Sequence, residues 1–307
     1  MDTPRPYQKI ALFVAALAVV FGAAVALGSV VEPAETNEGG MEETMATHTA
    51  ETETHGTQAS EEAGHRPAGL GVAEDGYAVR FASTEFQRGE ASELRFAIET
   101  EDGEALTEFD ELHERRMHLI VVRRDGTEFR HLHPEIDAAG TWSVPVRFAE
   151  PGVYRAFADF SAGGEQHTPA GDLFVSGGEF ESRPFPAPRA VDETDGYEVQ
   201  LRAGEPVAGE PSSLTFGVSE NGHPVHDLQP YLGAKGHLVA LREGDLAFLH
   251  VHPEEGHGDG AAHGHEGAAD EIAFEATFPT AGRYRLYLQF KHEGAVRTVE
   301  FTVVVPR

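Results

Sequence analysis

The fold of this chain is decided by the stretch MHLIVVRRDGTEFRHLHP, residues 117–134, and by its second copy GHLVALREGDLAFLHVHP, residues 236–253. Each copy has an apolar run, a central turn that pairs Asp with Gly, and a second run that ends in His-x-His-Pro. Turn residues of this kind between two apolar runs are typical of β-hairpins. Each copy is therefore predicted to form a hairpin with one histidine on its first strand and two at the end of its second.

The position of the turn determines which residues face one another. With the first turn at residues 125–126, His118 lies opposite His133, and Ile120 lies opposite His131. Residues two apart on a strand share a face, and directly opposed Cβ atoms lie about 4.5–5.5 Å apart. The three imidazoles are thus expected on one face, close enough to bind one ion with metal–nitrogen bonds of about 2.0–2.1 Å.

The same pairing, applied to the second copy with its turn at residues 244–245, predicts a second and equivalent set of histidines. We therefore expect two metal sites, one in each copy, with the ligands His118, His131, His133, His237, His250 and His252. Neutral imidazoles without thiolate suit Cu(II), Zn(II) or Ni(II). The expected cofactor is a copper or zinc ion.

Further ligands are expected nearby, with weaker support from the sequence. Asp159 and Gln289 occupy equivalent positions on the strand that follows each hairpin, so either can supply a fourth ligand. A Gly-rich insertion in the second copy, within residues 254–271, carries His257, His263 and His265. Histidine-rich tracts of this kind bind metal loosely, and the alternative is a loop with incidental histidines.

A structural role is the alternative for the main histidines. The face that carries them also carries large apolar side chains, which are Ile120, Val122 and Phe129 in one copy and Val239, Leu241 and Phe248 in the other. The histidines are therefore expected at one end of a stripe that faces the core of each sandwich. A hydrogen-bonded cluster without metal would fit the same pattern.

The chain beyond residue 69 is an internal duplication. Asp75-Gly-Tyr and Asp195-Gly-Tyr open two segments that share the hairpin and a later Gly-x-Tyr-Arg strand. The expected organisation is an N-terminal membrane anchor or signal segment (1–31), a disordered acidic linker (32–69), a first β-sandwich repeat (70–178), a Pro-rich linker (179–190) and a second β-sandwich repeat (191–307).

Each repeat consists of short segments with period-two alternation, separated by Gly, Pro, Asp and Asn turns. No stretch after residue 31 has helical periodicity. This pattern predicts an all-β fold with two tandem immunoglobulin-like antiparallel β-sandwiches. The chain has no cysteine, so the disulfide of antibody domains is absent.

Residues 10–31 form an uncharged segment rich in Ala, Val and Leu. As a helix at about 1.5 Å per residue it would be about 33 Å long, enough for a bilayer core of about 30 Å. Arg5 and Lys9 precede it, so the positive-inside rule places everything after it outside the cytoplasm. The expected location is the cell membrane, single-pass, with extracytoplasmic C-terminal domains. Cleavage after Ala26 is the alternative and would release a secreted protein.

The composition excludes several classes of function. The net charge of −29 is unsuited to nucleic acid, because phosphate binding needs clustered Lys and Arg. It is suited to attracting cations. The absence of cysteine excludes thiolate zinc sites, iron–sulfur clusters and blue-copper centres. We find no serine nucleophile elbow, no His-Glu-x-x-His and no nucleotide-binding glycine loop, so an enzyme is not expected.

The two M/G-H-L…H-x-H-P hairpins, each followed by a Gly-x-Tyr strand, resemble those of exported bacterial β-sandwich proteins. They are similar to the YtkA-like and copper-resistance-associated immunoglobulin-like domains, which are often anchored by one N-terminal helix. The resemblance covers residues 70–306 and rests on the six hairpin histidines. It implies a role in copper or other heavy-metal handling outside the cytoplasm, and it does not imply an enzyme.

The sequence therefore predicts a membrane-tethered metal-binding protein that buffers copper or zinc or delivers it. Its expected partners are the membrane, metal ions, and a metal transporter or chaperone. The alternative is a structural or adhesive pair of immunoglobulin-like modules with histidine clusters that bind no metal.

Overall fold

The structure is a computed structural model that describes residues 67–249, 251–253 and 271–307. All of them belong to the compact unit Glu62–Arg307. The expected membrane anchor, nearly all of the acidic linker and nearly all of the histidine-rich insertion lie outside the described residues. Within the described part, no helix is long and apolar enough to cross a membrane.

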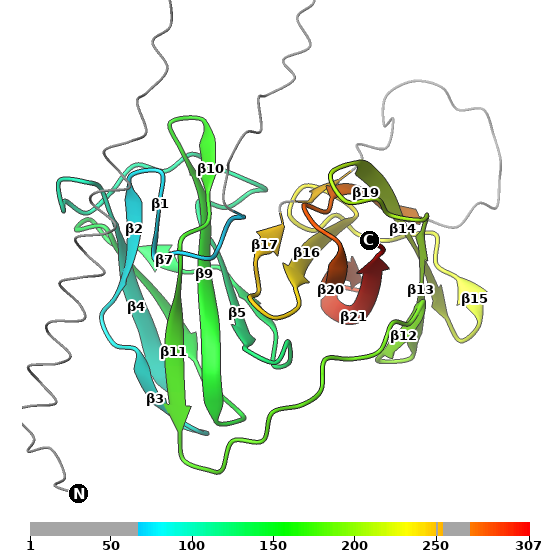
Figure 1. Cartoon of the computed structure of the whole chain (residues 1–307), viewed down its shortest axis with the longest axis horizontal. Helices are drawn as coiled ribbons and strands as arrows, with labels where there is room; N and C mark the ends of the chain where they lie inside the picture. Colours follow the sequence, from blue (N-terminus) through cyan, green and yellow to red (C-terminus); the bar gives the residue numbers. More distant parts are fainter. Residues whose placement is uncertain (1–66, 250, 254–270) are drawn as a thin grey trace, which may run out of the picture. The chain divides into compact units, whose positions relative to one another are not determined.

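Every regular element of the described residues is a β-strand, which confirms the predicted all-β class (Figure 1). Repeat 1, defined here as residues 70–178, contains eleven strands. They are β1 (Ala73–Glu74), β2 (Tyr77–Phe81), β3 (Glu85–Gln87), β4 (Ser92–Glu99), β5 (His118–Arg123), β6 (Arg130–Leu132), β7 (Glu135–Ile136), β8 (Thr141–Val146), β9 (Gly152–Ala162), β10 (Glu165–His167) and β11 (Ala170–Ser176).

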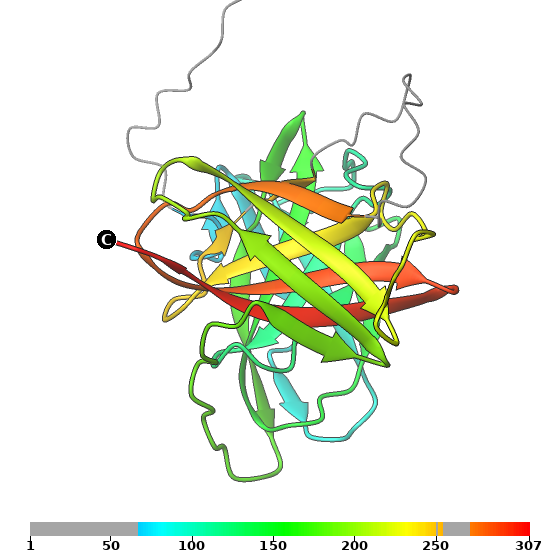
Figure 2. The ribbon, with the colours of Figure 1, turned by 90° about the vertical axis from the view of Figure 1, so that its right-hand side faces the viewer.

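Repeat 2, defined here as residues 191–307, has the same succession of long strands. Figure 2 looks onto this repeat, whose two sheets overlap in that view. Its strands are β12 (Val191–Thr194), β13 (Tyr197–Ala203), β14 (Pro211–Glu220), β15 (His223–Pro224), β16 (Gly236–Arg242), β17 (Phe248–Leu249), β18 (His252–Pro253), β19 (Glu271–Thr277), β20 (Gly282–His292) and β21 (Ala295–Val305).

Each repeat folds into two sheets. In repeat 1 the orders are β1-β2-β4-β8-β7 and β3-β11-β9-β5-β6, and in repeat 2 they are β12-β13-β14-β19-β18 and β17-β16-β20-β21. The pairings are antiparallel except that β3 runs parallel to β11. With β1 and β12 set aside, the first sheet of each repeat has the A-B-E-D order of an immunoglobulin domain. In the second sheets, β11-β9-β5 and β21-β20-β16 have its G-F-C order.

The two sheets of each repeat share one core. In repeat 1, Leu94 and Phe96 of the first sheet pack with Leu119 and Val121 of the second, around the fully buried Trp142. Repeat 2 has an equivalent core built from β13, β14 and β19 on one side and β16, β20 and β21 on the other. Sheets that bury alternate side chains against each other in this way form a β-sandwich.

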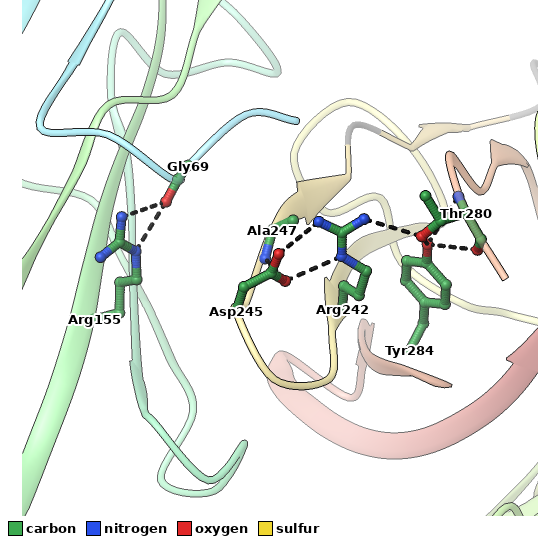
Figure 3. A network of polar contacts seen from close by, with 7 residues as sticks. All are labelled: Gly69, Arg155, Arg242, Asp245, Ala247, Thr280 and Tyr284. Atoms are coloured by element: carbon green, nitrogen blue, oxygen red, sulfur yellow. Dashed lines mark hydrogen bonds and ion pairs between the residues drawn. The ribbon is translucent and has the colours of Figure 1, made fainter. Parts of the chain in front are cut away.

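A tyrosine corner stabilises the start of the long strand in each repeat. The hydroxyl of Tyr154 donates to the carbonyl of Glu150 at 2.8 Å, and that of Tyr284 donates to the carbonyl of Thr280 at 2.9 Å (Figure 3). In immunoglobulin folds a tyrosine near the start of strand F makes this bond to the backbone just upstream. Both repeats therefore carry a local feature of that fold as well as its strand order.

The hairpins have the register that their turns predict. In repeat 1, Ile120 pairs with His131, and in repeat 2, Leu241 pairs with Phe248. An arginine and an aspartate close each turn: Arg123 donates to Asp125, and Arg242 donates to Asp245 (Figure 3).

The second hairpin, however, is shorter than predicted. Instead of lying opposite His237, His252 belongs to β18, which pairs with β19 in the other sheet, opposite Glu275. The chain therefore leaves the hairpin after β17. The predicted pairing of the first and last histidines of this copy is wrong.

The apolar stripe on each hairpin does not face the core of its own sandwich, and that expectation is corrected here. Alternation sends Leu119 and Val121 into the core of repeat 1, so Ile120 and Val122 point the opposite way. Their partners come from the other repeat. This third cluster, called the inter-repeat core, consists of Ile120, Val122, Phe157 and Ala170 from repeat 1 and Val239, Leu241, Leu246, Phe248 and Tyr287 from repeat 2.

Aromatic and polar contacts fix the two repeats at this core. The rings of Phe129 and Tyr287 stack with centroids 4.1 Å apart, and the Tyr287 hydroxyl donates to the carbonyl of Gly126 at 2.8 Å. The segment before β1 also takes part. The backbone N–H of Phe248 donates to Ala68, and Arg155 donates twice to the carbonyl of the neighbouring Gly69 (Figure 3).

Candidate metal centre

Histidines from both repeats meet beside the inter-repeat core. His118 is the first residue of β5, His131 lies on β6, and His133 follows β6 directly. His237, on β16, occupies in repeat 2 the position that His118 has in repeat 1. Because the two hairpin faces pack against each other, these four imidazoles converge. His113, in the loop before β5, lies next to them.

The rings are close enough to share one ion. The nearest pairs, His131 with His133 and His131 with His237, have centroids 4.6 Å apart. His118 lies 5.1 Å from His131, 5.2 Å from His133 and 5.5 Å from His237. One ligand nitrogen each from His118, His131 and His237 can be chosen so that all three lie within 4.8 Å of one another. We call His113, His118, His131, His133 and His237 the histidine cluster.

Hydrogen bonds to carbonyl oxygens orient two of these rings. Nε2 of His118 lies 2.9 Å from the backbone carbonyl of Leu112, and Nδ1 of His131 lies 2.7 Å from Oε1 of Gln289. A carbonyl oxygen only accepts, so each of these outer nitrogens carries a proton. In a neutral imidazole the other nitrogen then presents a lone pair. Ligand histidines in metal sites are held in this way.

The two inner nitrogens face each other. Nδ1 of His118 lies 2.9 Å from Nε2 of His131. With both outer nitrogens donating, two neutral rings would direct two lone pairs at one another across this distance. Such a contact is repulsive unless a proton or a metal ion lies between them.

Burial disfavours the proton. Burial is the largest cause lowering the pKa of His131 well below 6.5, and the neighbouring His237 and His118 lower it further. Burial likewise lowers the pKa of His118, against a smaller opposing effect of its bond to Leu112. Since a charged imidazolium is costly in this surrounding, neutral rings with ligand lone pairs dominate at neutral pH.

His133 and His237 have the same neutral character. Burial, followed by His118 and Arg115, lowers the pKa of His133 to about 4. Burial, followed by His118 and His113, holds the pKa of His237 well below 6.5. Nε2 of His133 is buried and has no hydrogen-bond partner among the described residues. A buried nitrogen without a partner is rare in a folded protein, and this one is available to bind a ligand.

The predicted ligands are thus brought together in part. His118, His131 and His133 lie together as expected, but His237 joins them, so one cluster is drawn from both repeats where two separate triangles were expected. His250 and the side chain of His252 lie outside the described residues. The histidines of the insertion, His257, His263 and His265, also lie outside the described residues.

The two weaker candidates behave differently from each other. Asp159 and Gln289 each lie directly across the sheet from a cluster histidine, Asp159 from His118 and Gln289 from His237. The carboxylate of Asp159 accepts hydrogen bonds from Gln166 at 2.9 Å and Thr168 at 3.2 Å. Gln289 reaches across to the other repeat, where it orients His131.

Sequence reasoning missed the sharing of the cluster between repeats, whereas His113 was expected as a weak extra ligand near the first hairpin. A signal for the sharing was present in β5, whose residues 119–122 are apolar on both faces of the strand. A strand that is apolar on both faces needs a cover on both sides. The opposite sheet of its own sandwich covers one face of β5, so the other face needs a second cover.

The fold and the cluster define a class of protein: two tandem immunoglobulin-like β-sandwiches that pack through equivalent hairpins and share one group of histidines. The chain belongs to the family described as "Domain of unknown function (DUF8832)", whose model matches it twice, at residues 72–177 and 192–307. No curated protein matches the chain.

Many solved structures are similar to the chain at a low level. Salmonella alpha-2-macroglobulin reacted with methylamine is 14% identical with a TM-score of 0.27, and the match covers 78% of this chain but only 15% of that protein. A DUF4426 family protein (PA0388) from Pseudomonas aeruginosa PAO1 is 10% identical with a TM-score of 0.29, covering 38% of this chain and 93% of that one. The Yersinia pseudotuberculosis adhesin InvE is 11% identical with a TM-score of 0.24, covering 74% and 58%.

Proposed function

We propose that this chain is a membrane-tethered extracytoplasmic protein that binds one copper or zinc ion tightly between its two repeats. His118, His131 and His237 would hold the ion, and His133 offers a fourth nitrogen. The observation that carries the proposal is the 2.9 Å separation of the inner nitrogens of His118 and His131, whose outer nitrogens both donate to carbonyl oxygens.

The donor set favours copper. Neutral imidazoles without thiolate suit Cu(II), Zn(II) and Ni(II), and of these Cu(II) binds most tightly to a given nitrogen site. The resemblance of the hairpins to copper-resistance-associated domains supports the same metal.

The rest of the chain suits a role in buffering or delivering the ion outside the cytoplasm. The uncharged segment 10–31 would anchor the chain, and the net charge of −29 would attract cations to it. The insertion with His257, His263 and His265 would bind further ions loosely. A metal transporter or chaperone would then receive the ion.

The test is a titration of the 307-residue chain with Cu(II) and with Zn(II), in the presence of glycine as a weak competing chelator that masks loose sites. We expect one ion per chain to resist the competitor. A single substitution, His118→Ala or His237→Ala, should abolish this tight site completely, because each repeat supplies part of it. His223→Ala is the matched control, since His223 is an exposed histidine on the short strand β15.

Two outcomes would count against the proposal. If no ion resists glycine, the cluster is a hydrogen-bonded group without metal, as in the structural or adhesive alternative. If His237→Ala leaves tight binding intact, the site does not lie between the repeats.

A further inference from the structure

The loop that carries His113 has an unusual backbone. Leu112 and Arg115 bond to each other in both directions, with N···O distances of 2.7 and 3.0 Å, so His113 and Glu114 form a two-residue turn. The φ angles of His113 and Glu114 are +48° and +62°. Both residues thus have the left-handed conformation of a type I′ turn, which favours Gly and Asn.

Repeat 2 makes the same turn with different residues. Tyr231 and Ala234 bond to each other there, and the two central residues are Leu232 and Gly233, with φ angles of +56° and +80°. The fold therefore requires the turn in both repeats. Only repeat 1 places a histidine in it, and repeat 1 does so without the glycine that relieves the strain in repeat 2.

The histidine of this turn points at the cluster. The His113 ring lies 5.8 Å from that of His237 and 6.1 Å from that of His118. The carbonyl of Leu112, at the start of the turn, accepts the hydrogen bond that orients His118. The turn thus orients His118 and places the imidazole of His113 next to that of His237.

The same turn lies at the protein surface. Glu114 is exposed, and Glu114 and Arg115 line, together with Glu111, a surface cavity of about 460 Å³ that none of the cluster histidines lines. His113 is partly exposed, as are His131, His133 and His237, whereas His118 is fully buried. His113 thus lies between this surface turn and the buried ring of His118.

We propose that His113 is the exchange ligand of the site, the residue through which an ion enters and leaves. This inference rests on the proposed metal site. An incoming ion exchanges a bound water for a nitrogen of His113 and then exchanges that nitrogen for those of the inner histidines, and departure reverses these steps. The oxidation state of the ion stays constant throughout. A residue that binds only during passage changes the rates of binding and release together and leaves the affinity nearly unchanged.

The test is His113→Asn in the 307-residue chain. Asparagine accepts the left-handed turn and removes the imidazole, so the fold and the orientation of His118 are retained. Stopped-flow mixing with Cu(II) gives the rate of binding, and transfer to an excess of a chromophoric chelator gives the rate of release. We expect both rates to fall about tenfold, because the local concentration of ion-binding groups along the path is reduced, with the Kd changed less than about threefold.

His223→Asn is the matched control and should change neither rate. Faster release with a correspondingly weaker Kd would make His113 a permanent ligand and overturn the exchange role. Unchanged rates would show that His113 takes no part. If the wild-type chain holds no ion in the presence of glycine, the proposed metal site itself is wrong. This outcome is distinguishable from a failure of the exchange role, because the wild type and all variants then behave alike.

Discussion

Oε1 of Gln289 lies 2.7 Å from Nδ1 of His131, so a glutamine of repeat 2 orients a histidine of repeat 1. The contact spans the boundary between the two sandwiches at the centre of the histidine cluster. Its counterpart in repeat 1 is Asp159, whose carboxylate accepts bonds from Gln166 and Thr168 within its own repeat. The equivalent side chains thus act on the cluster in different ways. Gln289 hydrogen-bonds to a histidine of the other repeat. Burial has the largest effect on the pKa of His118 and lowers it, and the charge of Asp159 in the same repeat raises it.

Gln289→Leu should weaken the tight binding of Cu(II) or Zn(II) by about 10–100-fold, the usual effect of removing a group that orients a ligand histidine. The leucine keeps the volume but leaves Nδ1 of His131 without its acceptor. Gln289→Glu should bind at least as tightly as the wild type, because a carboxylate oxygen accepts the same hydrogen bond. Competitive titration measures both, and equal affinities of the Leu variant and the wild type would contradict the role.

The stability of the metal-free protein should fall as the solution is acidified from pH 6.5 toward pH 4. Burial lowers the pKa of His133 from 6.5 to about 4, so in this window the unfolded chain binds a proton that the folded chain does not. His131 and His237, whose pKa values are lowered well below 6.5, act in the same direction. Above about pH 7 neither state is protonated at these groups, and stability should be level.

Thermal unfolding in the presence of a chelator, recorded at several pH values, checks this dependence. His133→Ala should show a shallower loss of Tm between pH 6.5 and 4 than the wild type, since one lowered pKa is removed. His223→Ala should retain the wild-type slope. A slope that His133→Ala leaves unchanged would mean that His133 is not a buried neutral base.

The sequence was sufficient to predict the two hairpins and their register next to the turns, but not where the second hairpin ends. The turn at residues 125–126 and the alternation of apolar residues are local properties, and local properties determine which residues pair. The observed pairing of Ile120 with His131 follows directly from them. The fold class could be predicted for the same reason, because short alternating segments bounded by turn residues have few other solutions.

The sequence was not sufficient to predict what covers the histidine face. Ile120 and Val122 are apolar, and apolar residues are buried equally well by the opposite sheet or by a second domain. A duplicated motif then suggested two equal sites. The packing of the two repeats decides otherwise, because it joins His237 to the histidines of repeat 1, and that packing depends on contacts such as the stacking of Phe129 on Tyr287, which no local pattern specifies.

The inter-repeat core should link stability to metal affinity. Leu241, fully buried, packs in this core, and Leu214, also fully buried, packs in the core of repeat 2 alone. Each substitution by Ala should lower the free energy of unfolding by about 2–5 kcal/mol, the usual effect of a cavity. Only Leu241→Ala should also weaken metal binding by the folded protein, because Leu241 packs between the two repeats and the metal site is drawn from both of them. Equal affinities of the two variants would contradict a site shared across this core.

The equivalent Arg–Asp salt bridges of the two hairpin turns lead to a last prediction, which concerns how the repeats are joined. Arg123 and Asp125 have side chains only 3% exposed, and Asp125 also accepts from the backbone N–H of Arg183 in the connector at 2.9 Å. The equivalent Asp245 is 42% exposed and bonds to Arg242. Asp125→Ala should therefore destabilise the protein by about 3–5 kcal/mol, since it leaves a buried guanidinium without its partner, and Asp245→Ala by about 1 kcal/mol. Limited proteolysis should cut the connector, residues 179–190, faster in the Asp125 variant alone. Similar losses of Tm and similar cleavage in both variants would show that the buried bridge does not fix the connector.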